Sequence, residues 1–285
     1  MLAKNTVRTI GALTRPGTLT HKGPMNTAIF EATVAMTTTV NDRPHTAYVP
    51  VYAVGPAAER LFANTVAGST VTLDGVVRQE KWTAAGIKRS RTRVHVLRSE
   101  VLQGGTLLTD QGGGYRLAEG GLNAVVLGGN LVSVATLRNT KTDGTGDPVC
   151  DFSVALNSSY RNGKGEKIET VDYVDVVAWR DLATQVASLP KGAAVLIEGA
   201  IVSESWTDKG GQKRSALKFQ ATKLDVVIAP VQTAPVSAAP VQTAPVQAAP
   251  VAAVQAAPVF EPPIEDLIPD NADYPAADEE DDLPF

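Results

Sequence analysis

Trp82 and Trp206 occupy matching places in two similar stretches of this chain, each beside basic residues and a glycine-bearing turn. A tryptophan ring that faces water offers a flat surface on which an unpaired nucleobase can stack, and neighbouring Lys and Arg can neutralise phosphates. Strand alternation puts Trp82 on the same side as Arg78 and Glu80, which is a water-facing series. Because proteins normally avoid exposed tryptophan, we expect both rings to belong to a binding surface.

Further aromatic residues lie in the strand-like segment that precedes each tryptophan. Alternate residues between Tyr173 and Trp179 are apolar, which leaves these two rings on the opposite side of the strand, beside Asp175. The earlier segment places Tyr48 and Tyr52 on the equivalent side. An ordinary core role is the alternative for each ring, but the alternation and the repetition favour exposure.

Basic residues are interleaved with these rings. Arg91, Arg93 and His95 share one side of a strand whose other side carries Val94 and Val96, so the cations should point outward together. A solvated hairpin without a ligand is the alternative interpretation. Contact with phosphates would make affinity fall with salt, with a slope of about −0.7 per phosphate of a single strand. The candidate cations are Arg78, Lys81, Arg89, Arg91, Arg93, Lys213 and Arg214.

The elements that would position these residues occur twice, at a spacing of about 125 residues. Tyr48-Val-Pro-Val-Tyr-Ala-Val corresponds to Tyr173-Val-Asp-Val-Val-Ala-Trp, and the glycine-bounded segment 68–75 corresponds to 192–199. Two copies of one domain explain this pattern.

Composition divides the chain into five parts. A glycine-rich connector that we interpret as a hinge separates the two copies, and a repetitive Ala-Pro-Val-Gln linker follows the second. Proline every few residues forbids both a helix and a strand ladder, so we expect this linker to be disordered. The expected parts are domain 1 at 1–103, the connector at 104–120, domain 2 at 121–228, the linker at 229–260 and an acidic tail at 261–285.

The second copy shows most clearly which fold to expect. Strand-like runs lie near 123–137, 149–159, 171–179, 193–206 and 214–227. The segment 181–189 has apolar residues at helical spacing between the third and fourth runs, and 56–64 occupies the same slot in the first copy. Five strands with a helix in that place predict an all-β chain of two tandem OB-folds, which are small Greek-key barrels, although other small barrels remain an alternative.

Charge is distributed unevenly along the chain. Residues 1–103 hold 13 Lys and Arg against 6 Asp and Glu, whereas residues 230–285 hold 10 acidic residues and no basic one. The body is therefore available to a polyanion in spite of the acidic pI of about 5.5. With Cys150 as its single cysteine, and neither a signal peptide nor a membrane span in its sequence, the chain is expected in a reducing cytoplasm.

The acidic tail ends in Asp281, Asp282, Leu283, Pro284 and Phe285. Phe285 combines a ring with a carboxylate, and the preceding acids suit a basic pocket on a partner protein. A simple solubility tail is the alternative. We expect this tip to recruit other proteins.

The sequence shows no catalytic constellation. His21, His45 and His95 all lie in the first copy without counterparts in the second, and one cysteine cannot build a zinc site with the usual spacing. We expect a binding protein without enzymatic activity, cofactor or metal.

The second copy resembles the bacterial single-stranded DNA-binding proteins over residues 121–228. The resemblance lies in the segments Asn123-Ala-Val-Val-Leu-Gly-Gly-Asn-Leu, Asp172-Tyr-Val-Asp-Val-Val-Ala-Trp-Arg-Asp-Leu-Ala, Lys191-Gly-Ala-Ala-Val-Leu-Ile-Glu-Gly and Glu204-Ser-Trp-Thr-Asp-Lys-Gly-Gly-Gln. The first copy resembles the family more faintly, and the acidic tip is similar to the family's tip. The resemblance implies sequence-independent binding and protection of single-stranded DNA in replication, recombination and repair.

The resemblance also implies particular roles for residues and a state of assembly. Tyr160, with Arg161 beside it, would join Tyr173, Trp179 and Trp206 at the base-stacking positions. In the first copy only Tyr48 and Trp82 match, because Thr38 and Val54 stand where rings would be expected. The second domain should therefore stack more bases, and the first should rely more on its cations. The branch of the family with two OB-folds per chain implies a homodimer carrying four.

Three other functions would use a similar sequence. An RNA-binding OB-fold protein, acting as a chaperone or translation accessory, would use the same rings and cations. A protein-interaction scaffold would bind no nucleic acid. A nuclease is the third, but no acidic metal-binding cluster recurs in both copies.

Overall fold

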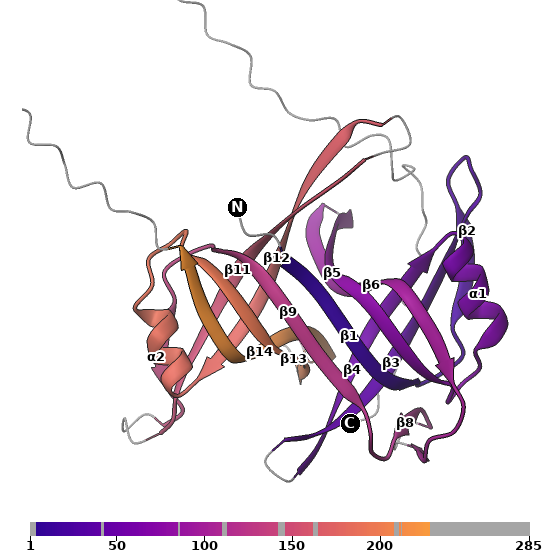
Figure 1. Cartoon of the computed structure of the whole chain (residues 1–285), viewed down its shortest axis with the longest axis horizontal. Coiled ribbons are helices and arrows are strands. Elements are labelled where there is room, and N and C mark those ends of the chain that lie inside the picture. The colour runs from indigo at the N-terminus through magenta and orange to yellow at the C-terminus, as the bar shows by residue number, and fades with distance from the viewer. Residues whose placement is uncertain are drawn as a thin grey trace, which may run out of the picture. The chain divides into compact units, whose positions relative to one another are not determined.

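The computed structural model describes residues 4–40, 43–84, 86–109, 113–141, 146–161, 165–207, 211 and 213–228. The expected linker and acidic tail, residues 229–285, lie outside the described residues. Strands dominate the described part, and two short helices accompany them (Figure 1). The prediction of an all-β fold is confirmed.

The first barrel closes around the side chains that alternate inward along its strands. It consists of β1 (Lys4–Leu13), β2 (Thr18–Lys22), β3 (Thr27–Val40), β4 (Arg43–Val54), α1 (Pro56–Asn64), β5 (Thr70–Ala84) and β6 (Ile87–Leu102). β1 pairs with both β3 and β5, and β4 meets β6 in parallel at Val51 and Val94, which closes the sheet. Val71, Leu73 and Val77 of β5 are buried, while Thr72, Asp74 and Val76 are partly exposed on the other side.

The second barrel repeats this arrangement. It consists of β9 (Leu122–Leu131), β10 (Thr136–Asn139), β11 (Pro148–Arg161), β12 (Lys167–Trp179), α2 (Asp181–Ala187), β13 (Ala194–Thr207) and β14 (Lys213–Ile228). It closes where β12 and β14 pair in parallel at Val176 and Phe219. A closed sheet with its helix between the third and fourth long strands is the OB-fold, so both copies adopt the predicted architecture.

The first long strand of each barrel differs from the expectation of one continuous run at 123–137. It is divided into β9 and β10 in the second barrel, and into β1 and β2 in the first. The two parts differ in their partners, because β9 pairs with β13 and β1 and only briefly with β11, whereas β10 pairs only with β11 among the described strands. The chain must turn between these partners, and the strand is interrupted there.

A bulge recurs at matching glycines of the two barrels. The register between β5 and β6 shifts at Gly75, and the register between β13 and β14 shifts at Gly199. A Cβ at Gly75 would lie 2.3 Å from the carbonyl oxygen of His95, and one at Gly199 would lie 2.1 Å from that of Gln220. The extra residue sits on the partner strand, so the alternation along β5 is preserved as far as Trp82.

An asparagine beside each bulge bonds the backbone of the neighbouring strand. The side chain of Asn5 donates to the carbonyl oxygen of Val77 and accepts from its N–H, both at 2.8 Å. Asn123 does the same with Ile201, at 2.7 and 2.9 Å. These amides continue the pairing where the regular ladders of β1 with β5 and of β9 with β13 have ended.

The two helices have the predicted positions, although α2 ends two residues earlier than the expected 181–189. Each follows a residue with positive φ, which is Gly55 at 64° and Arg180 at 55°. None of the helices that the structure describes is long and apolar enough to cross a membrane.

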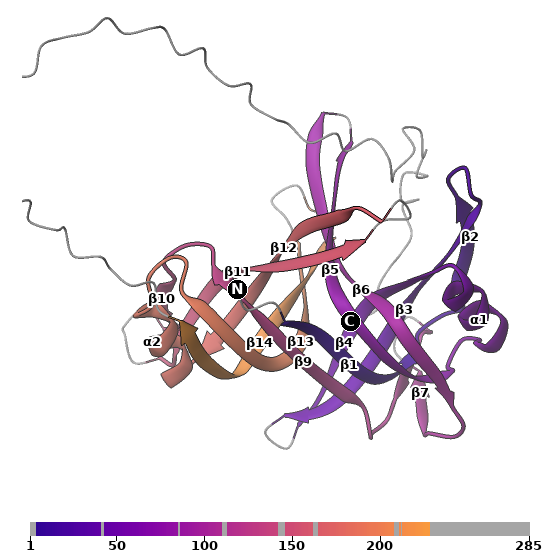
Figure 2. The same cartoon turned by 45° about the horizontal axis from the view of Figure 1, so that its top comes forward.

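The barrels are joined by direct strand pairing. β1 and β9 run antiparallel from Lys4 opposite Gly128 to Ile10 opposite Leu122, and this pairing makes the strands of both barrels one continuous sheet. Figure 2 shows β1 and β9 side by side. The sequence offered no sign of this joint, because pairing between strands so far apart leaves no local signature.

The glycine-rich connector differs from the hinge that we expected. It contains a hairpin of β7 (Leu107–Thr109) and β8 (Tyr115–Leu117). Leu117 is buried, and the N–H of Tyr115 donates to the carbonyl oxygen of Thr14 at 2.9 Å. A Cβ at Gly121 would lie 2.1 Å from the carbonyl oxygen of Thr37, so the glycine permits close packing against the first barrel.

Candidate nucleic-acid interface

All three tryptophans are exposed on the outer surfaces of the barrels. Trp82 and Trp179 are each 39% exposed, and Trp206 is 49% exposed. Trp82 on β5 and Trp206 on β13 lie at matching positions, as the internal repeat of the sequence predicted. Water contact with such large rings is unfavourable unless a ligand covers them. The alternative of a core role therefore does not hold for these three residues.

The second barrel gathers aromatic side chains on adjoining strands. Tyr173, which is 40% exposed, and Trp179 point outward from β12, while Val174 and Val176 point into the core. β14 lies between β12 and β13, so Trp206 belongs to the same outer surface. Asp175, between the two β12 rings, accepts a hydrogen bond from Ser153 at 2.7 Å. This surface can stack several unpaired bases in succession.

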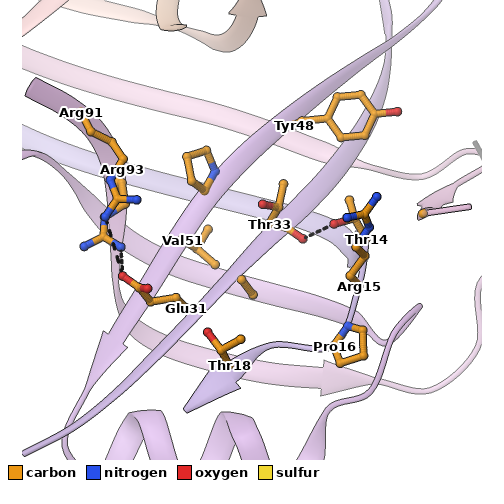
Figure 3. A pocket seen from close by; sticks show the side chains of 13 residues that line it. Thr14, Arg15, Pro16, Thr18, Glu31, Thr33, Tyr48, Val51, Arg91 and Arg93 are labelled. Carbon is orange, nitrogen blue, oxygen red and sulfur yellow. Dashed lines mark hydrogen bonds and ion pairs between the residues drawn. The ribbon is translucent and has the colours of Figure 1, made fainter. Parts of the chain in front are cut away.

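The first barrel has a groove on the corresponding surface. Its volume is about 420 Å³, and Figure 3 shows Tyr48 and the pair Arg91 and Arg93 on opposite sides of it. Thr14 helps to fix its edge, because its hydroxyl donates to the carbonyl oxygen of Thr33 at 3.2 Å. A groove with a tyrosine on one side and the exposed Arg91 guanidinium on the other suits a base with its phosphate. Other lining residues are Arg15 and Pro16 of the turn after β1, Thr18, Glu31 and Pro50.

Tyr52 differs from one expectation, because its ring is only partly exposed and two neighbouring side chains pack against it. The His95 ring stacks on it with centroids 4.7 Å apart and an interplanar angle of 8°, and the Arg93 guanidinium lies 4.5 Å from its centroid. Burial, followed by the nearby charge of Glu80, raises the pKa of Tyr52 to about 12. Tyr52 is thus a packed, partly buried ring that offers a base less surface than the exposed aromatic residues do.

Arg93 corrects a second expectation. It is only 5% exposed, and its guanidinium binds the carboxylates of both Glu31 and Glu80. Burial alone would raise the pKa of Glu31, but the hydrogen bond and charge of Arg93 outweigh this effect and hold that pKa below its ordinary value. A cation neutralised in this way supports the surface instead of contacting a phosphate. Strand alternation had correctly given its side of β6, but alternation cannot reveal its partners.

The second barrel repeats this ion-pair arrangement in a more exposed form. Lys218 of β14 lies 3.3 Å from Asp151 of β11 and 2.8 Å from Glu204 of β13. Arg93 and Lys218 each lie one residue before the parallel contact that closes their barrel. Both barrels therefore contain a cation that bridges two acids at the same place in the fold. Comparing the sequences of the two copies did not reveal this repeat.

Arg78 corrects a third expectation, because it connects the two barrels. Its guanidinium donates to Asp172 at 2.9 Å and to Ser158 at 2.6 Å, and the backbone N–H of Gln79 donates to the same carboxylate at 2.8 Å. Asp172 is only 5% exposed. A carboxylate on the inward side of a strand requires a cationic partner. The inward position of Asp172 was therefore the signal from which the sequence could have predicted an ion pair at this residue.

The other candidate cations of the first barrel remain at the surface. Lys81 and Arg89 are exposed, and the Lys81 ammonium lies 4.7 Å from the Tyr173 ring centroid. Arg91 lies 6.0 Å from the Trp82 ring and 3.1 Å from Glu80. These cations lie beside exposed rings, as expected of a surface that neutralises phosphates next to stacked bases.

Some candidates fall outside the described part of the structure. Tyr160, Arg161, Lys213 and Arg214 lie in strands β11 and β14, but their side chains are not among the described ones. The partner-binding candidates at 281–285 lie outside the described residues altogether. Among the described residues, no group of three or more His, Cys, Asp and Glu side chains could hold a metal ion.

Comparison with known proteins places this geometry in a family. Residues 122–227 match the profile of the Single-strand binding protein family. The chain is 37% identical over 233 residues to the single-stranded DNA-binding protein of Deinococcus radiodurans, covering 78% of this chain and 75% of that protein. It is 31% identical over 229 residues to the single-stranded DNA-binding protein of Thermus thermophilus, covering 78% of this chain and 83% of that protein.

A solved structure supports the fold independently of sequence. The wild-type single-stranded DNA-binding protein from Thermus aquaticus superposes with a TM-score of 0.61 at 23% identity, covering 82% of this chain and 98% of that one. At this identity the likeness concerns the fold alone, and it includes both barrels. Because it is 37% identical to the Deinococcus relative over 75% of that protein's length, the chain belongs to the single-strand binding protein family.

Proposed function

We propose that this chain binds single-stranded DNA, independently of sequence, along the outer surfaces of its two barrels. The observation that carries the proposal is the exposure of Trp82, Trp179, Trp206 and Tyr173 beside surface cations. Membership of the family, whose relatives from Deinococcus and Thermus are named single-stranded DNA-binding proteins, supports the same ligand. Such binding would protect unpaired DNA during replication, recombination and repair.

The chemistry of the surface explains why the ligand should be single-stranded. A base inside a duplex has both of its faces covered by its neighbours, whereas an unpaired base can place one face on an aromatic side chain. Stacking contributes about 1 to 3 kcal/mol per base and is sequence-tolerant, because every base has a π face. The surface therefore requires no catalysis and no cofactor.

Titration of the full chain with oligo-dT, followed by tryptophan fluorescence, tests this proposal. We expect quenching of the emission, and an affinity that falls linearly with salt on logarithmic axes, by about −0.7 per phosphate contacted. Competition with oligo-rU of equal length distinguishes DNA from RNA. A preference for RNA would favour an RNA chaperone, and no binding at low salt would favour a protein scaffold.

The assembly that we propose is a homodimer with four barrels. The last strands of both barrels expose apolar side chains at matching places, Val101 on β6 and Val226 on β14, and a partner surface would cover such residues. Molar mass measured by light scattering tests the proposal. Twice the chain mass of 29.9 kDa is expected, and a monomer or a tetramer would contradict it.

The acidic tip is proposed to recruit replication and repair proteins. Asp281 and Asp282 would meet basic side chains of a partner, and Phe285 would supply an apolar anchor. Deleting the last eight residues should abolish binding to such proteins while DNA affinity stays unchanged or rises, because a polyanionic segment competes with DNA for cations. Loss of DNA affinity in this variant would contradict the assignment.

A further inference from the structure

The two barrels meet at a second place besides the pairing of β1 with β9. Strand β5 of the first barrel contacts β12 of the second, where Arg78 and Gln79 hold the carboxylate of Asp172. Figure 2 shows these strands close together. Because Asp172 is buried and bonded from two consecutive residues of β5, the register of β5 against β12 is fixed. The residues that follow on each strand, Lys81 and Tyr173, are thereby brought together.

The contact between Lys81 and Tyr173 crosses the boundary between the barrels. The ammonium of Lys81 lies 4.7 Å from the Tyr173 ring centroid, within the range of a cation–π interaction. Both side chains are exposed, so a ligand can reach them. Tyr173 is also one of the aromatic residues that we propose as a stacking platform. The cation over its ring thus comes from the other copy of the domain.

The matching contact on the other side of the molecule lacks this cation. There β13 of the second barrel meets β4 of the first, and Ser203 accepts a hydrogen bond from the backbone N–H of Tyr48 at 3.2 Å. By the internal repeat, Ala47 takes the place of Asp172, Val202 takes that of Arg78, and Ser205 takes that of Lys81. None of them carries a charge. These three places therefore lack the ion pair that joins Arg78 to Asp172, and no lysine stands at the place of Lys81.

We infer that Lys81 and Tyr173 form one composite nucleotide site, to which each barrel contributes one residue. The inference rests on the proposed function and specifies how the two barrels share one stretch of DNA. A base that stacks on Tyr173 takes the place of the ammonium over the ring. The flexible four-carbon stem of Lys81 lets the ammonium turn to the phosphate beside that base. Arg78 and Asp172 are positioning residues that hold the two halves in register.

A double-mutant cycle on the full chain tests the composite site. Affinity for oligo-dT is measured by fluorescence titration at several salt concentrations for Lys81→Gln, Tyr173→Leu and the double variant. Lys81→Gln should reduce the salt slope by about 0.7, the share of one phosphate contact. Because the lysine serves the nucleotide that Tyr173 holds, we expect the double variant's fold-loss to be at least about threefold smaller than the product of the single losses.

Three controls make the result specific. Lys81→Gln combined with Tyr48→Leu should show losses that multiply, because no contact joins these two residues among those that the structure describes. Lys81→Arg and Tyr173→Phe keep the cation and the ring, and they should retain coupling. Lys223→Gln removes a lysine already held by Glu198 and Asp225, and it should leave the salt slope unchanged. Circular dichroism and urea unfolding verify that each variant folds.

Each outcome bears on a separate claim. Multiplying losses for Lys81 and Tyr173, an unchanged salt slope in Lys81→Gln, or full affinity in Tyr173→Leu would each overturn the composite site while the proposed function stands. A wild-type chain that does not bind oligo-dT at low salt would overturn the proposed function itself.

Discussion

The two barrels share their backbone but differ in the surface that they offer to a ligand. Both have the bulge glycine, the bonding asparagine and the parallel closing contact at matching places. On the first barrel Arg93 and His95 cover Tyr52, and Val54 stands where the second barrel has Trp179. The second barrel leaves three rings exposed. Features that close the barrel have been retained in both copies, whereas the side chains facing outward have diverged.

The same contrast appears in the ion pairs of the outer surface. In the first barrel, Arg93 is buried between two acids and supports a packed ring. In the second, the equivalent Lys218 bridges its acids at the surface. We therefore expect the first barrel to contribute rigidity and cations, and the second to contribute most of the stacking.

The largest expected effect is a difference in oligo-dT affinity between variants of the second barrel and variants of the first. Changing Tyr173, Trp179 and Trp206 together to Leu should weaken oligo-dT binding more than changing Tyr48 and Trp82, at about 1 to 3 kcal/mol for each stacked base that is lost. Filter binding with labelled oligo-dT measures both. Tyr52→Leu is the matched control, because a covered ring should contribute little to affinity. Equal losses from the two sets would remove the distinction between the barrels.

The next effect concerns stability. Arg93→Met removes the buried cation between Glu31 and Glu80 but leaves Arg91 within 3.8 Å of both acids. The free energy of unfolding should therefore fall by about 2 to 3 kcal/mol, which is less than for a buried pair that loses its whole partner. Lys218→Met removes the equivalent cation from a more exposed site, so a loss of about 1 kcal/mol or less is expected. Urea unfolding measures both. A larger loss of stability in Lys218→Met than in Arg93→Met would show that the burial of the cation does not determine its contribution.

A smaller effect is expected at the helix starts. Gly55 and Arg180 both have positive φ with a strongly negative ψ, a sparsely populated conformation that costs a residue with a Cβ on the order of 1 kcal/mol. Gly55→Ala should therefore destabilise the first barrel by about that amount. Arg180→Gly should change stability by only a few tenths of a kcal/mol, because relief of strain is offset by the greater freedom of the unfolded chain. Thermal unfolding compares them, and a large loss in Arg180→Gly would show that its side chain matters more than its backbone.

The smallest effect is a pH dependence confined to the first barrel. Burial, followed by the charges of Arg78 and Arg93, lowers the pKa of His95 below its ordinary value of 6.5. The unfolded chain then binds a proton more readily than the folded chain, so stability should be lost as the pH falls through 6.5. The second barrel has Gln220 at this place, and His95→Gln should flatten the dependence. Urea unfolding at pH 7.5 and pH 5.5 measures the change, and an identical dependence in the variant would exclude His95 as its source.

Much of this architecture could be predicted from sequence, because local patterns encode it. Alternation placed Trp82 and Trp179 outward, and the repeat placed Trp206 at the position that matches Trp82. The repeat located both helices between the third and fourth long strands. Each of these inferences used residues close together in the chain, where the period of a strand or a helix determines which side a residue faces.

The parts that could not be predicted depend on contacts between distant residues. Alternation gave the correct side for Arg78 and Arg93, but it said nothing of Asp172 or of Glu31, which neutralise them. The hairpin in the connector depends on packing against the first barrel, which glycine content does not reveal. A cation on the outer side of a strand is therefore evidence of a phosphate contact only after its partners are known.

Photocrosslinking tests the central claim most directly. The full chain would be irradiated with bound oligo-dT, and the crosslinked residues identified by mass spectrometry of the peptides. Covalent adducts are predicted at Trp206, Trp179, Tyr173 and Trp82, with none at Tyr52. Bound DNA that crosslinks at Tyr52, or only to residues outside the outer surfaces of β3 to β6 and β11 to β14, would contradict the account.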